Sequence, residues 1–192
     1  MLRKFSAIVL TIMVLAGSLA ASTRVVLELF LVSPSVNQSV RYGRRTANLT
    51  NKSGDPDTVA RQLLTGVCAH SILHSTSWRW ERNGTLVLTY LAYSEDSHCT
   101  DAEPQEISMS ALLPPQSTNP EKPRPAEIRE QDVLAHGLRH LTFLMRYSPD
   151  DRIRKAVSPA GLQFFQALCG QLAGRYDTAK EFADCTSTLG IK

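Results

Sequence analysis

The chain lacks the motifs with which common enzyme classes bind phosphates, dinucleotides or calcium, or form a serine nucleophile. It contains no P-loop, no Gly-x-Gly-x-x-Gly fingerprint, no Asp-rich calcium loop and no Gly-x-Ser-x-Gly elbow. It also lacks a strong charge, since 21 basic and 18 acidic residues leave a formal net charge of +3 over 192 residues. One basic face usually dominates a nucleic-acid-binding domain. The sequence therefore excludes nucleic acid as the expected partner and does not favour an enzyme.

The first 20 residues have the three parts of a secretory leader. A short basic start at residues 1–4 is followed by the apolar stretch 5–15 and then by small residues. Ser18 and Ala20 are small residues at the −3 and −1 positions, which predicts cleavage between Ala20 and Ala21. The apolar stretch is shorter than the about 20 residues of a spanning helix. Secretion or periplasmic export is therefore favoured, and an uncleaved N-terminal anchor, the only predicted contact with a membrane, is the second alternative.

A third alternative is an intracellular domain whose start is mis-assigned and lies near residue 21. The four cysteines, Cys68, Cys99, Cys169 and Cys185, separate these alternatives. In an exported chain they would form disulfides, and proximity along the predicted elements favours Cys68–Cys99 and Cys169–Cys185 among the three connectivities. In an intracellular protein the same residues would be thiols.

Residues 21–192 are predicted to form one α+β domain, with a small antiparallel sheet packed against C-terminal helices. The strongest local signal is a hairpin over about 74–93, because Asn83-Gly84 supplies the two positive-φ residues of a type I′ turn. That turn pairs Trp78 with Thr89 and Trp80 with Val87. Both tryptophans are then expected on the core side of the sheet.

Periodicity and turn residues predict the remaining elements. Gly43, between two short extended pieces, indicates a second hairpin. Asp55 and Ser158, each followed by proline, are expected to cap helices. The other predicted elements are a strand at 25–32, a helix at 57–68, a strand at 107–113, a proline-rich internal loop over 104–125, and a helical part over 126–186 with helices at 126–147, from 158 onward, and at 178–185.

His136 and His140 are four residues apart on the first of these C-terminal helices, so both project from one side. That side is nearly opposite an aliphatic stripe formed by Leu134, Leu138, Leu141 and Met145. A His-x3-His pair binds a metal ion at two points, although the glutamate of zinc peptidases is absent between them. His70 and His74, at the open end of the hairpin, are candidates for the remaining ligands. A zinc-binding protein or metallohydrolase is therefore the alternative function.

The favoured function is a non-enzymatic binding module, exported or membrane-anchored, with no expected cofactor and an unidentified protein or small molecule as partner. This interpretation assigns different roles to the tryptophans and the histidines. Replacing Trp78 is expected to unfold the domain, whereas replacing His136 or His140 is expected to alter binding and to leave stability nearly unchanged.

Overall fold

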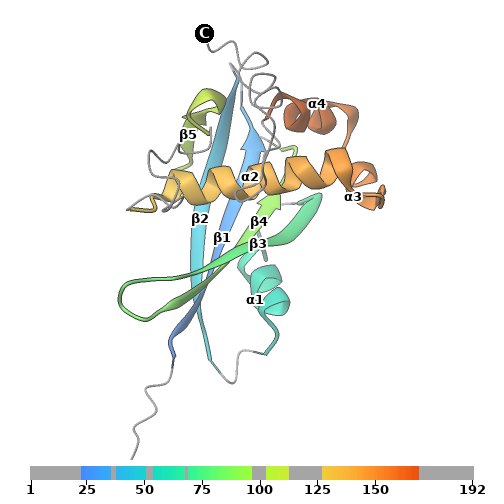
Figure 1. Ribbon diagram of the computed structural model, residues 1–192. Helices are drawn as coiled ribbons and strands as arrows, with labels where there is room; N and C mark the ends of the chain where they lie inside the picture. The colour runs from blue at the N-terminus through green and yellow to red at the C-terminus, as the bar shows by residue number, and fades with distance from the viewer. Residues whose placement is uncertain are drawn as a thin grey trace, which may run out of the picture.

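A computed structural model describes residues 23–35, 38–50, 54–67, 69–96, 103–112 and 127–168. Five strands form one sheet in the order β3-β4-β1-β2-β5 (Figure 1). The elements are β1 (Val25–Pro34), β2 (Ser39–Leu49), α1 (Pro56–Leu63), β3 (Ile72–Trp80), β4 (Leu86–Tyr93), β5 (Gln105–Ser108), the 3-10 helix η1 (Met109–Leu112), α2 (Glu130–Tyr147), α3 (Arg152–Lys155) and α4 (Pro159–Ala167). The predicted α+β class is confirmed, but the sheet is mixed, because β1 runs parallel to β4.

Strand β1 lies in the middle of the sheet and is covered on both faces. Its residues from Leu27 to Ser33 are all buried, as expected for a nearly continuous apolar run. Alternate residues point to opposite faces of a strand. Leu27, Leu29 and Leu31 pack with α1, whereas Phe30 and Val32 belong to the larger core under α2. The two helices therefore cover opposite faces of one sheet.

Helix α1 begins as predicted, with the Asp55 side chain accepting a hydrogen bond from Thr58 N at 3.3 Å. Pro56 occupies the first turn, where no partner for an N–H is needed. The helix ends at Leu63, earlier than predicted, and a turn follows in which Gly66 has φ +75°. Val59, Ala60 and Leu64 are its buried contacts with the sheet.

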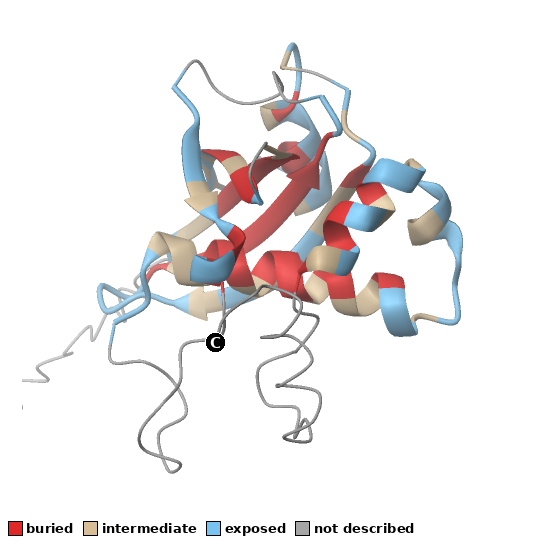
Figure 2. Cartoon of the chain, turned by 90° about the horizontal axis from the view of Figure 1, so that it is seen from above, coloured by how far each residue is buried: buried red, intermediate tan, exposed pale blue. Residues whose placement is uncertain are grey.

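Helix α2 lies across the other face of the sheet (Figure 1), and the predicted aliphatic stripe is the side that meets the strands. Leu134, Leu138 and Leu141 are fully buried and Met145 is 5% exposed. Gly137 permits the close approach, because a Cβ there would lie 3.0 Å from Leu91 Cδ1. Buried residues concentrate in the strands beneath this helix (Figure 2).

Helix α4 closes the end of this core. The predicted cap is confirmed, since Ser158 Oγ accepts a hydrogen bond from Gly161 N at 3.2 Å. Phe164 and Phe165 lie with ring centroids 5.5 and 4.8 Å from the buried Tyr93 ring. The short helix α3, which the sequence did not predict, precedes it.

Two predicted turns differ from the structure. Gly43 lies within the continuous strand β2, opposite Leu31, and the turn of this hairpin comes earlier, around Gln38 with φ 55°. The ladder between β1 and β2 extends over ten residue pairs, and this long-range pairing overrides the local glycine signal. Residues 105–112 form β5 and η1 and are not loop, which corrects the start of the predicted loop at 104–125.

The predicted type I′ turn at Asn83-Gly84 is also wrong. Glu81 pairs with Thr85 through a 2.9 Å hydrogen bond, so three residues, 82–84, form the loop. Gly84 has φ +76°, whereas Asn83 does not have a positive φ. This is the pattern of a type I turn followed by a left-handed residue. The register consequently differs, with Trp78 opposite Leu88 and a bulge between Ser75 and Ser77.

Several predictions fall outside the described residues. They are the leader with its cleavage site at Ala20 and Ala21, all four cysteines with both disulfides, most of the proline-rich loop and the helix at 178–185. In the part of the chain that is described, no helix is long and apolar enough to span a membrane.

Candidate functional site

Two tryptophans, the only ones in the chain, are exposed on the edge strand β3. Trp78 is 66% exposed and Trp80 is 55% exposed, contrary to the predicted core position. The observed register pairs them with Leu88 and Leu86, which places them on the face of the sheet covered by α1. Shifting a strand by one residue moves its side chains to the other face. That shift explains why the predicted core residues are on the surface.

The tryptophans continue into an apolar row that crosses four strands at one end of the sheet. Leu86 is the neighbour of Trp80 on β4, Val25 is the next residue across on β1, and Leu49 follows on β2. We call this surface the tryptophan platform; it consists of Trp78, Trp80, Leu86, Leu88, Val25 and Leu49. Its four aliphatic residues are half-buried.

Helix α1 covers the neighbouring rows of the same face. Leu88 and Leu49 of the platform pack against the edge of the cluster beneath it, whereas Trp78 and Trp80 stay exposed. Leu27, Leu29 and Tyr90 are buried with α1, and the Tyr90 hydroxyl donates to Asp57 on that helix at 2.5 Å. Scattered exposed apolar residues are ordinary, but a contiguous patch usually marks an interaction site. The tryptophan platform is contiguous and contains two exposed aromatic side chains of the type enriched in binding hot spots.

Three of the predicted metal ligands lie together where α2 crosses β3. The ring centroids of His74 and His140 are 5.2 Å apart, and those of His136 and His140 are 6.5 Å apart. Both contacts are edge-to-face. No ring contact within the described part of the chain joins His70, in the connection before β3, to the other three.

All three clustered histidines are held toward the neutral form. Burial lowers the pKa of each ring, and the charge of His140 lowers the pKa of His74 further. Arg139 does the same for His136. A hydrogen bond from the His140 ring to the Thr76 backbone partly offsets the effect of burial on its pKa. Neutral imidazoles keep a lone pair that can bind a metal or accept a hydrogen bond.

Arg139 itself is a buried cation on α2. Its Nε donates to the Ala135 carbonyl at 3.2 Å, and its Nη1 has no hydrogen-bond partner. Burial lowers the pKa of its guanidinium to about 10. No three histidine, cysteine or carboxylate side chains among the described residues are placed to hold a metal ion as they stand. The histidine cluster therefore supplies ligand types but not a formed metal site.

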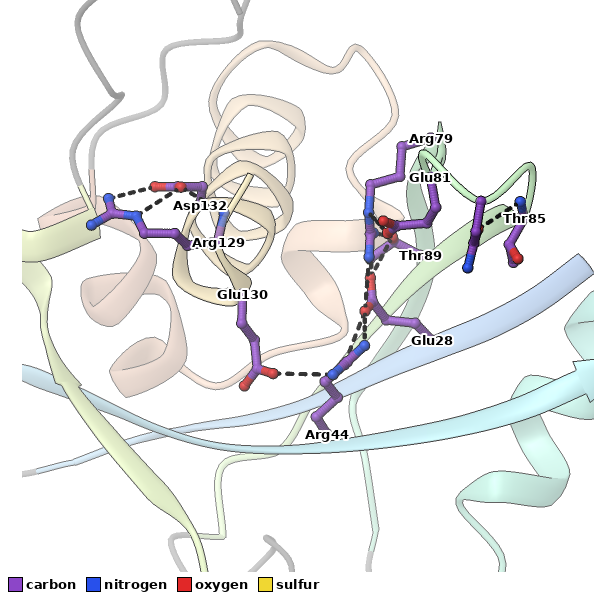
Figure 3. A network of polar contacts seen from close by, with 10 residues as sticks. Glu28, Arg44, Arg79, Glu81, Thr85, Thr89, Arg129, Glu130 and Asp132 are labelled. Carbon is purple, nitrogen blue, oxygen red and sulfur yellow. Dashed lines mark hydrogen bonds and ion pairs between the residues drawn. The ribbon is translucent and has the colours of Figure 1, made fainter. Parts of the chain in front are cut away.

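A second polar cluster, centred on the buried Glu28 and reaching from the sheet to α2, was not predicted (Figure 3). Glu28, on β1, is 1% exposed and forms ion pairs with Arg79 at 2.6 Å and with Arg44 at 2.8 Å. Thr89 Oγ1 donates to the same carboxylate at 3.0 Å. Arg44 also reaches Glu130 on α2 at 3.2 Å, which joins the sheet to the helix.

Burial would raise the pKa of the Glu28 carboxyl, but Arg79, Arg44 and Thr89 together lower it. The carboxylate is thus ionised and fully paired, which is the role of a structural ion pair. The sequence did contain a signal for it, because Glu28 is the single charged residue in the apolar run of β1. A buried strand rarely contains an acidic residue without a partner.

No protein-family model matches the chain, and a search of curated proteins finds no similar sequence.

Proposed function

We propose that the protein is a non-enzymatic binding module and that the tryptophan platform is its binding surface. The observation that carries this proposal is the exposure of Trp78 and Trp80 on one face of an edge strand, at 66% and 55%. An exposed tryptophan contributes little to folding, whereas it supplies large, rigid contact area to a partner. Export, or anchoring by the N-terminal leader, belongs to the same proposal and rests on the leader sequence.

The proposal predicts that the two tryptophans are dispensable for folding. Trp78→Ala and Trp80→Ala should each lower the free energy of unfolding by less than about 1 kcal/mol, whereas truncating a buried tryptophan costs about 3–5 kcal/mol. Urea unfolding followed by circular dichroism measures this without a tryptophan signal. Phe165→Ala, at a residue 1% exposed, is the control that should be strongly destabilised. A loss of 3 kcal/mol or more in either tryptophan variant would return these residues to the core and refute the proposal.

A second candidate function, metal binding by His74, His136 and His140, is favoured by their convergence at the crossing of α2 and β3. A ligating histidine usually donates its second ring N–H to a carbonyl or carboxylate. The His140 contact with the Thr76 backbone is of this kind. The rings would have to turn from their edge-to-face arrangement for three nitrogens to reach one zinc ion.

Zinc titration tests this second function. Zinc that binds only the folded state should raise the free energy of unfolding of the full chain, by about 2.7 kcal/mol at a hundredfold excess over its Kd. His140→Gln should abolish that increase, and His70→Gln, the matched control outside the cluster, should retain it. An increase that survives in His140→Gln, or no increase in the parent protein, excludes zinc binding by this cluster.

A further inference from the structure

We propose that the tryptophan platform docks on the interfacial layer of a phospholipid membrane. The inference rests on the proposed function, because it takes the platform as the binding surface and names its partner. Three observations carry it: the side chains of the platform, the point at which the chain enters the sheet, and the charges around that point.

The side chains are of the type that favours a lipid interface. Trp78 and Trp80 are exposed, and the half-buried Leu86, Leu88, Val25 and Leu49 lie in the same rows beside them. Tryptophan is enriched at membrane–water interfaces because its ring is amphipathic. A row of aliphatic residues flanking it is suited to contact the acyl boundary, whereas a soluble ligand would be bound in a concave site.

The chain enters the sheet at this same row. Val25, the first residue of β1, pairs with Leu86, which in turn pairs with Trp80. The nine residues 16–24 separate Val25 from the apolar stretch 5–15, and nine residues reach at most about 30 Å. This observation applies to the alternative in which the leader is not cleaved. A leader retained in a membrane keeps this end of the sheet near the lipid surface, on which the platform can dock without a large entropic cost.

The charges at this end of the sheet are compatible with anionic lipid. Arg24 precedes Val25 and is exposed, and its side chain donates to Asn48 at 3.0 and 3.1 Å, not to a carboxylate. Glu81 is paired with Arg79, with 2.9 Å between Oε1 and Nε, although this cation is shared with Glu28. Each basic residue near an anionic surface strengthens binding by about fivefold.

Tryptophan fluorescence of the full chain tests the inference, because Trp78 and Trp80 are the only emitters of their kind. The chain is reconstituted into vesicles of phosphatidylcholine alone and of phosphatidylcholine with phosphatidylglycerol. We expect emission to shift to shorter wavelength, shielding from iodide, and quenching when the lipids are brominated near the headgroup. The quenched fraction should be larger with phosphatidylglycerol. The docking equilibrium constant derived from it should be about fivefold lower in Arg24→Ala than in the parent.

A matched reporter separates platform docking from general closeness to the membrane. Tyr147 is 55% exposed on α2, on the other side of the sheet. The protein with Trp78→Phe, Trp80→Phe and Tyr147→Trp should float with the vesicles. The emission of its single tryptophan, at position 147, should be neither shifted nor quenched. Equal quenching of this reporter and of the native tryptophans would overturn the inference.

Two other outcomes also overturn it. Unshifted, unquenched native emission in vesicle-bound protein would show that the platform faces away from lipid. A shift that depends on protein concentration and not on vesicles would assign the platform to a second copy of the chain, paired through the edge strand β3. Either result leaves the proposed function standing if Trp78→Ala and Trp80→Ala remain as stable as the parent, so the two proposals fail separately.

Discussion

Arg79→Met is expected to lower the free energy of unfolding by about 3 kcal/mol at pH 7, the lower end of the range for breaking a buried ion pair. The substitution keeps most of the side-chain volume but leaves the Glu28 carboxylate, 1% exposed, without its shortest ion pair. Arg44 and Thr89 still contact that carboxylate, which limits the loss. Urea unfolding monitored by circular dichroism measures the difference.

Arg44→Met is the matched control for this prediction. Arg44 contacts the same carboxylate but its side chain is 40% exposed, so its removal should cost no more than about 1 kcal/mol. Equal losses in the two variants would contradict the assignment of Arg79 as the principal partner of Glu28.

The free energy of unfolding should depend less strongly on pH in Arg79→Met than in the parent. In the parent, the Glu28 pKa is lowered, so its contribution to stability is present above the ordinary value of 4.5 and is lost as the pH falls through the folded-state pKa. Arg79→Met removes the largest of the contributions that lower this pKa, so we expect the Glu28 pKa to be higher than in the parent. Protonation as the pH falls then costs the variant less stability than it costs the parent. The difference in free energy of unfolding between the parent and the variant is therefore largest at neutral pH and becomes smaller at acidic pH. A deficit that stays constant down to pH 4 would show that Arg79 acts through packing alone.

The helices were predictable from sequence because their signals are local and agree with one another. The stripe of α2 is buried as expected, and Asp55 and Ser158 cap α1 and α4. For α1 and α4, the spacing of apolar residues, a capping side chain and the proline directly after it indicate the same element, whereas for α2 the apolar spacing alone does so. Tertiary contacts then had no conflict to resolve in these three helices, and only their ends differ from the prediction, whereas the short helix α3 was not predicted.

The strands were less predictable because their positions depend on partners far along the chain. Nothing near β1 indicates that β4 will pair with it in parallel. The hairpin loop has three residues where two were predicted, and this single residue reverses the face of Trp78 and Trp80. Asn-Gly is compatible with both loops, so local sequence alone cannot select between them.

The candidate site was predicted in part for the same reason. Helical spacing placed His136 and His140 on one side of α2, but only the path of β3 under that helix brings His74 to them. The tryptophan platform was missed entirely, since exposure is a property of the assembled sheet. The sequence of β3 did draw attention to Trp78 and Trp80, but it placed them in the core.

Leu91→Ala is expected to have the second large effect, a loss of about 3–5 kcal/mol in the free energy of unfolding. Leu91 is 1% exposed on the α2 face of β4, and its Cδ1 lies 3.0 Å from the point where a Cβ on Gly137 would be. The close approach of α2 leaves little room for the site to collapse further, so truncation should leave a cavity near its full volume.

Leu88→Ala is the control, because it makes the same chemical change three residues earlier on the same strand. Leu88 lies on the opposite face beside Trp78 and is half-buried, so its truncation should cost about 1 kcal/mol. Comparing the loss in free energy of unfolding between Leu91→Ala and Leu88→Ala shows which face of β4 is buried in the core near the tryptophans. A larger loss for Leu88 than for Leu91 would mean that the face with the tryptophan platform is covered in the free protein, and it would remove the surface on which the binding function rests.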